Sequence, residues 1–219
     1  QYRCQLRVKL YPQENHIEIK VPVNVAIHSH EDYLEQVGVA FGFHTMLTTD
    51  KGRCYGKELG RYQSEYSDWM QKQASSYSRN KENNAGRKKY NAKKRRLEEH
   101  LHSYINQELN RFLVIEKPKT VYIVKLPKPQ VRGYNKKINY SITQWKRGYI
   151  RKRLTQKCME QSIEIVEVLG KEISTECSKC GKLGMKAEGQ FICPACGYRA
   201  EEKTNTACNV KKRGLGDGI

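Results

Sequence analysis

The chain has 219 residues and a formal net charge of +18, from 41 Lys and Arg against 23 Asp and Glu. This length allows one hydrophobic core and a small metal-stabilised module, and no apolar stretch reaches the roughly 18 residues of a membrane span. No amphipathic anchor or lipidation motif accompanies the charge, so we expect nucleic acid, and no membrane, as the partner. No signal peptide is visible. Because the chain starts at Gln1, we treat it as the C-terminal portion of something longer.

The first 36 residues carry four basic and five acidic side chains, so the positive charge lies further along. Alternating apolar and polar residues over 2–27, broken at Pro12–His16, predict a β-hairpin, which we interpret as part of a barrel. A shorter version of this pattern covers residues 37–56. There Asp50-Lys51-Gly52 separates two β-prone runs and predicts a tight hairpin.

A long helical stretch is predicted from about Arg61 to Phe112, with a break near Asn83–Gly86. Its second half carries an apolar stripe made of Tyr90, Leu97, Leu101, Tyr104, Ile105 and Leu109. Charge runs on helices are usually only solvated faces, but seven bases open this half with no nearby acid, and we interpret them as a phosphate-facing rail. These bases are Arg87, Lys88, Lys89, Lys93, Lys94, Arg95 and Arg96.

An apolar run, Thr120–Val124, predicts a buried central strand. A basic loop and a basic helix over Ile142–Cys158 follow, and we expect Trp145, Tyr149, Ile150, Leu154 and Met159 to point inward. From Lys117 to Lys157 there are thirteen Lys and Arg and no carboxylate, which indicates a surface that faces a polyanion. The expected contacts are Lys128, Arg132, Lys136, Lys137, Lys146, Arg147, Arg151, Lys152 and Arg153. Tyr134, Tyr140 and Trp145 are candidates for stacking on bases or sugars, although Trp145 fits a core position equally well.

Two Cys-x-x-Cys knuckles separated by twelve residues follow a β-rich run at Ile163–Leu169. Such knuckles aim four thiolates at one metal, so this spacing predicts zinc, and a site without a free position for water is structural. The ligands are Cys177, Cys180, Cys193 and Cys196. Two disulfides, or four unrelated thiols, are the alternatives. Gly181 and Gly197 follow the knuckles, where the chain must turn. A helix from about Glu201 to Lys212 closes the chain, and this order of strands and helices predicts an α/β domain with a mixed sheet.

From about Val37 to its end, the chain resembles the RuvC-like nuclease domain of the TnpB family, transposon-encoded RNA-guided nucleases related to type V CRISPR effectors. The resemblance rests on Gly38-Val-Ala-Phe-Gly-Phe, Val121-Tyr-Ile-Val, the two knuckles and Asn205-Thr-Ala-Cys-Asn-Val. It implies an RNase H/RuvC-like mixed sheet with flanking helices over residues 37–173, an inserted zinc ribbon over 174–199, and a terminal helix and tail over 200–219. Residues 1–36 resemble part of that family's wedge β-barrel.

The chain departs from this family at the catalytic positions. RuvC-type cleavage needs three carboxylates around divalent metal ions, and the matching positions are Ala40, Lys125 and Lys203. An ammonium group cannot ligate magnesium, so we expect no catalytic Mg²⁺ and no cleavage. The alternatives are a nuclease that uses displaced acids, namely Asp50, Glu201 or Glu202, and a decaying relic of a mobile element.

The chain thus resembles nuclease-dead, guide-RNA-directed transcriptional repressors derived from TnpB. This resemblance implies a noncoding guide RNA and target double-stranded DNA as partners, and a cytoplasmic, nucleoid-associated location in bacteria. We further expect Lys125 and Lys203 to hold a DNA phosphate, the alternative being that both are merely solvated. A rival from another class is a stand-alone zinc-ribbon DNA-binding protein, for which no helix-turn-helix spacing or dimerisation heptad is visible. The oligomeric state stays open.

Overall fold

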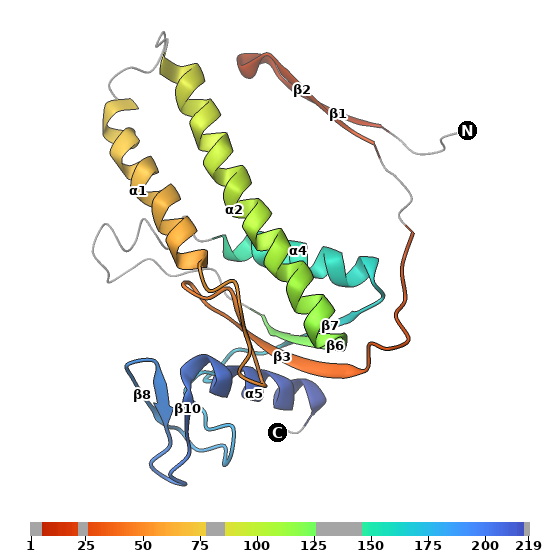
Figure 1. Ribbon diagram of the computed structural model, residues 1–219, viewed down its shortest axis with the longest axis vertical. Coiled ribbons are helices and arrows are strands. Elements are labelled where there is room, and N and C mark those ends of the chain that lie inside the picture. Colours follow the sequence, from red (N-terminus) through yellow and green to blue (C-terminus); the bar gives the residue numbers. More distant parts are fainter. Residues whose placement is uncertain (1–5, 22–25, 78–85, 126–145, 217–219) are drawn as a thin grey trace.

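The computed structural model describes residues 6–21, 26–77, 86–125 and 146–216. Its centre is a five-stranded sheet with the strand order β5-β4-β3-β6-β7 (Figure 1). Strands β3, β6 and β7 run parallel, whereas β4 and β5 extend the sheet beyond β3 as antiparallel strands, so the predicted mixed sheet is confirmed. The strands are β3 (Glu35–Phe41), β4 (Leu47–Thr49), β5 (Cys54–Tyr55), β6 (Pro118–Val124) and β7 (Glu164–Val168).

Helices cover both faces of this sheet, because the side chains of its parallel strands alternate between two apolar sides. Three helices pack on one face, α1 (Leu59–Tyr77), α2 (Gly86–Glu116) and α4 (Arg147–Glu160). That core joins Val37, Val39, Val121 and Ile123 of the sheet to Leu59, Leu101, Ile105, Leu109, Phe112, Ile150 and Leu154 of the helices. Helix α5 (Glu202–Leu215) covers the opposite face, where Val210 packs near Tyr122 and Val124 (Figure 1).

Most of the predicted elements are confirmed. The long helical stretch is divided into α1 and α2, the turn at residues 50–52 connects β4 to β5, and β6 is buried between two parallel neighbours. The described part of the second basic helix begins at Arg147, and its expected start at Ile142 lies outside the described residues. In the part of the chain that the structure covers, no helix is long and apolar enough to cross a membrane.

The inward position of Met159 was predicted wrongly. Its side chain is 67% exposed, and Cys158 is buried in its place. The buried positions of α4 are Ile150, Leu154 and Cys158, which repeat every four residues along one side of the helix. Met159 lies about 100° further round the helix, on the solvent side.

The N-terminal hairpin is confirmed as a hairpin only. Strands β1 (Arg7–Tyr11) and β2 (His16–Lys20) pair antiparallel around a 3-10 turn, η1 (Pro12–Glu14), and form a sheet of two strands (Figure 1). Val8 faces Ile19 and Leu10 faces Ile17, so the apolar alternation places these four side chains on one side of the ribbon, each more than half exposed. The barrel stays a prediction.

Close contact between α5 and β3 depends on a glycine. A Cβ atom on Gly38 would lie 2.3 Å from the carbonyl oxygen of Ala207 and 2.7 Å from the Cβ of Lys211. Asp50 secures the same contact from the side. Its carboxylate accepts from the Gly38 amide and pairs with the Lys211 ammonium, both at 2.9 Å, and its side chain is only 10% exposed.

We therefore expect Gly38→Ala to lower the free energy of unfolding by about 1–3 kcal/mol, because α5 must move away from the sheet. Gly148→Ala is the matched control: a Cβ atom there meets nothing within 4 Å, and the change adds roughly 0.5–1 kcal/mol of helix stability. Denaturant unfolding followed by circular dichroism measures both. Equal effects of the two substitutions would contradict this account of the contact.

Candidate metal centre and nucleic-acid surface

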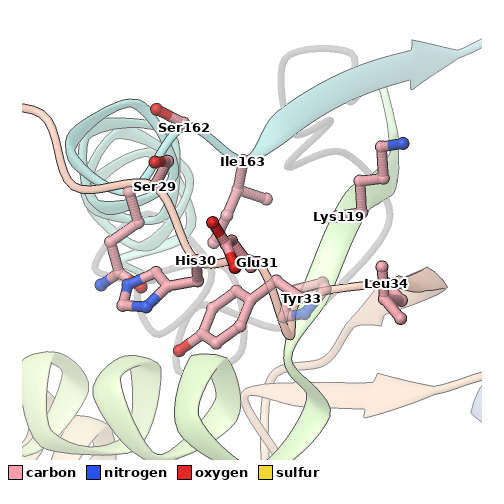
Figure 2. Close-up of a pocket in the computed structure, with 10 residues that line it drawn as sticks. Ser29, His30, Glu31, Tyr33, Leu34, Lys119, Ser162 and Ile163 are labelled. Atoms are coloured by element: carbon pink, nitrogen blue, oxygen red, sulfur yellow. The ribbon is translucent and has the colours of Figure 1, made fainter.

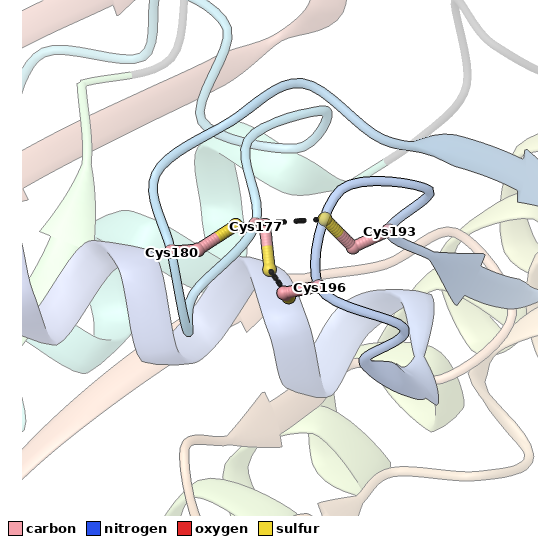
Figure 3. Close-up of side chains that lie close together, drawn as sticks. All are labelled: Cys177, Cys180, Cys193 and Cys196. Atoms are coloured by element: carbon pink, nitrogen blue, oxygen red, sulfur yellow. Dashed lines mark hydrogen bonds between the residues drawn. The ribbon is translucent and has the colours of Figure 1, made fainter.

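The four predicted metal ligands converge on one point (Figure 3). The Sγ atoms of Cys177 and Cys196 are 3.7 Å apart, those of Cys180 and Cys193 are 3.5 Å apart, and all four lie within 4.8 Å of one another. Four Zn–S bonds of about 2.3 Å in a tetrahedron place the sulfurs about 3.8 Å apart. A disulfide requires about 2.05 Å. The arrangement therefore fits a bound metal such as zinc and does not fit the disulfide alternative.

Both knuckles have the same turn. The amide of Gly181 donates to the carbonyl oxygen of Cys177, the amide of Gly197 donates to that of Cys193, and each hydrogen bond is 2.9 Å long. The two glycines have φ of 76° and 70°, a conformation that strains residues with a side chain, which confirms their predicted role. The strands β8 (Met185–Ala187), β9 (Gln190–Ile192) and β10 (Arg199–Glu201) form the antiparallel sheet of this module.

Two asparagines in α5 hold the first knuckle against the main domain. Asn205 accepts from the amide of Ser178 at 2.9 Å and donates to the carbonyl oxygen of Glu176 at 2.8 Å. Asn209, one turn later, donates to the carbonyl oxygens of Ile173 and Glu176 at 3.0 and 2.7 Å. Both amides are buried, so losing a partner is costly. Sequence reasoning singled out this motif but missed its role, which is to satisfy the backbone of a loop about 30 residues away.

The remaining described cysteines do not join the cluster. Among the residues that the structure describes, the four knuckle cysteines are the only group of three or more Cys, His, Asp or Glu placed to hold a metal. Burial raises the pKa of the Cys158 thiol to about 12, so this thiol stays protonated in the core. Cys4 lies outside the described residues.

We expect the purified chain to contain one zinc ion, because the four thiolates complete the tetrahedral coordination of a single ion. Mass spectrometry of the metal content measures this. Cys180→Ser should lose the metal and unfold the β8–β10 module, whereas Cys54→Ser should keep it. A full complement of zinc in Cys180→Ser, or its loss in Cys54→Ser, would disprove this assignment of ligands.

The three positions predicted to correspond to RuvC carboxylates lie on a strand, directly after a strand and on the last helix. Ala40 is buried in β3, and Lys125 directly follows β6 and is exposed. Val39 pairs with Ile123 in the parallel register. Ala40 and Lys125 therefore both lie at the carboxyl ends of their neighbouring strands. Lys203 lies in the first turn of α5, half exposed, with its ammonium 3.6 Å from a carboxylate oxygen of Glu202.

Each acid considered as a displaced ligand already has partners. Asp50 binds the Gly38 amide and Lys211, and Glu201 caps α5 by accepting from the amide of Thr204 at 2.6 Å. Glu202 pairs with Lys186 at 3.1 Å. Burial alone would raise the pKa of Glu202, but the ammonium groups of Lys186 and Lys203 outweigh it and hold this pKa below its usual value.

The predicted rail on α2 is largely exposed. Lys88, Lys89, Lys93, Arg95 and Arg96 are exposed, and Lys94 is half-buried. Lys93 has its ammonium 5.5 Å from the centre of the Trp69 ring, and Arg95 pairs with Glu99 at 3.5 Å. Nothing is described of the Arg87 side chain. The described helical bases are thus placed in solvent, where phosphate groups can reach them.

Several predicted contacts on α4 instead hold the protein together. Lys146 forms an ion pair with Glu98, Arg151 pairs with Glu167, and Arg153 donates to Asn106 at 2.8 Å. Burial would raise the pKa of Glu98, but Lys146 holds it below its usual value. Lys152 is exposed, and Arg147 is half-buried. Lys128, Arg132, Lys136 and Lys137, with Tyr134, Tyr140 and Trp145, lie outside the described residues.

Residues 148–210 match the family model of the Cas12f1-like TNB domain. For this part of the chain, the match confirms the predicted relationship to TnpB- and Cas12f-like proteins. A search of curated proteins found no match.

Three solved structures are similar to the chain at low identity. The Cas12f1–sgRNA–target DNA complex shares 18% identity at a TM-score of 0.48, covering 89% of this chain and 52% of that one. A CRISPR-Cas12f ternary complex shares 16% at 0.49, covering 94% and 44%. The mini-RNA-guided endonuclease CRISPR-Cas phi3 shares 16% at 0.39, covering 64% and 24%. The chain spans about half the length of the first two, and likeness this distant does not carry function from them to it.

Proposed function

We propose that this chain is a nuclease-dead, RuvC-like member of the TnpB group that binds DNA under the direction of a guide RNA and represses transcription by occupying its target. Base pairing between guide and target reads the sequence, while the protein reads backbone shape and charge. The match of residues 148–210 to the Cas12f1-like TNB domain and the net charge of +18 support this partner class.

The partners of Asp50 are the main support for the proposal that the chain does not cleave DNA. One oxygen of Asp50 accepts from the Gly38 amide and the other pairs with the Lys211 ammonium, so the charge of this carboxylate is already neutralised by a cation. A magnesium ion bound to Asp50 would be repelled by the Lys211 ammonium, which lies 2.9 Å from one of these oxygens. Together with Ala40 and Lys125 at the edge of the sheet, this arrangement favours a site that does not hold a catalytic metal.

The replacement lysines supply a further element of the proposal. Lys125 is exposed and, among the described residues, its ammonium has no partner, while Lys203 is shared with Glu202 alone. In an active site of this kind, metal ions neutralise the phosphate. Here we assign that role to the two ammonium groups, which bind a DNA phosphate and have no means of activating water.

The test of the proposed function is recovery of the tagged chain from cells, with sequencing of the RNA that accompanies it. We expect one discrete RNA species, and no cutting of a matching DNA duplex with Mg²⁺, because the metal ligands are replaced. A parallel sample carries Ala40→Asp, Lys125→Glu and Lys203→Asp together, which places carboxylates at all three positions. Its melting temperature shows whether this variant is folded. Cutting by the unaltered chain would disprove the dead-nuclease proposal, and absence of RNA would favour a plain DNA-binding protein.

Replacing both lysines, Lys125→Ala with Lys203→Ala, should weaken DNA binding and flatten its dependence on salt. Two lost phosphate contacts reduce the slope of log K against log salt by about two units. The double variant Lys20→Ala with Lys57→Ala removes the same charge elsewhere and serves as the control. Filter binding at four salt concentrations measures the slopes. An unchanged slope, or an equal change in the control, would mean that the two lysines are merely solvated.

A further inference from the structure

A segment next to the sheet covers a cavity that none of the functions above uses. Residues 26–34 lead into β3 and lie along the end of α4, where the amide of His28 donates to the carbonyl oxygen of Glu160 at 2.9 Å. Asp32 forms an ion pair with Lys117, just before β6. Between this segment, the start of β6 and the turn after α4 lies a cavity of about 240 Å³ (Figure 2).

The cavity combines an aromatic platform with unpaired polar groups. The rings of His30 and Tyr33 are stacked, with centroids 4.2 Å apart and planes inclined by 16°. His30 is exposed, so a ligand in the cavity can reach this aromatic pair. Ser29, Glu31 and Ser162 also line the cavity, and among the described residues their side chains have no hydrogen-bond partner. Figure 2 shows these side chains on the segment and on the turn that faces it.

The charge of the lining indicates which ligand fits. One carboxylate, Glu31, and one ammonium, Lys119, line the cavity, so its lining has no net positive charge that would favour a bare phosphate. Its volume equals that of about eight waters at about 30 Å³ each, room for a flat heterocycle. Single-stranded nucleic acids are held by stacking of bases on aromatic rings, histidine included, and by hydrogen bonds to their edges.

Glu31 selects among the bases, because an ionised carboxylate only accepts hydrogen bonds. Guanine presents two adjacent donors on its pairing edge, N1–H and the N2 amino group, which match the two carboxylate oxygens. Adenine and cytosine each present an amino group next to a ring nitrogen that repels a carboxylate. Uracil presents one imino group between two carbonyl oxygens. Guanine is therefore the base that this lining fits best.

We propose that this cavity binds a guanine base of a single strand, stacked on His30 and hydrogen-bonded by Glu31. The inference deepens the proposed function by naming an anchoring point for RNA, and it rests on that function only for the source of the strand. Lys119 also lines the cavity and is the cation that we assign to the phosphate of the bound nucleotide. Free guanine nucleotides and single-stranded DNA carry the same base, so the test separates these three sources.

The test uses the full chain and fluorescein-labelled RNA pentamers U-U-X-U-U, in which only the middle base X differs, followed by fluorescence anisotropy. We expect the pentamer with guanine to bind about tenfold more tightly than those with adenine, cytosine or uracil, the discrimination of a two-bond contact. Glu31→Gln and, separately, His30→Ala should reduce this preference to twofold or less. Glu188→Gln is the matched control: it makes the same change of net charge on an exposed turn and should keep the tenfold preference.

Three results would overturn the inference: no preference for guanine in the unaltered chain, a preference that survives Glu31→Gln, or its equal loss in Glu188→Gln. Competition by guanosine monophosphate as strong as that of the pentamer would overturn the assignment to a strand, and stronger binding of the DNA pentamer would overturn the assignment to RNA. A guanine preference without any RNA recovered from cells would sink the proposed function and leave this inference standing. A recovered guide RNA with no guanine preference would do the reverse.

Discussion

The contact between α5 and β3 is the constraint on which the rest of the structure depends. Gly38 lets the helix backbone approach the strand, and Asp50 joins the strand, the β4–β5 turn and Lys211 through a carboxylate that is almost fully buried. Because α5 is held at this distance, its two buried asparagines meet the loop of the first knuckle. The module with the four cysteines is thus positioned through one helix.

The acidic side chains around this contact stabilise the fold. In a metal-dependent nuclease, carboxylates at the edge of such a sheet must be free to bind cations. Here Asp50 forms an ion pair with Lys211 of α5, Glu201 caps the helix and Glu202 pairs with lysines. The basic groups divide in a similar way: Lys146 and Arg151 hold α4 in place, while Lys125 and most of the α2 rail remain exposed. Some of the basic side chains therefore stabilise the fold, and others form a cationic surface.

The sequence by itself determined the element order, the mixed α/β class and the four cysteines that the fold brings together. Periodicity reports burial directly, which is why β6 and the stripe of α2 were predictable, and two Cys-x-x-Cys knuckles at this spacing have few geometric solutions. The prediction failed at Met159 because it followed the more apolar residue, whereas the four-residue repeat set by Ile150 and Leu154 continues to Cys158. The hairpin of residues 7–20 was predictable from alternation, yet alternation alone does not say what covers an apolar face.

Only the tertiary structure decided which charged and polar groups are free. The partners of Asp50, Asn205 and Arg151 come from segments that are 12 to 161 residues away in sequence, and no local pattern encodes such pairs. The cavity beside His30 and Tyr33 is of the same kind, since three separate segments line it. A local sequence pattern reflects which side chains of one segment are buried in the core and which are exposed to water. A site requires several segments to meet, and their meeting is set by packing across the whole fold.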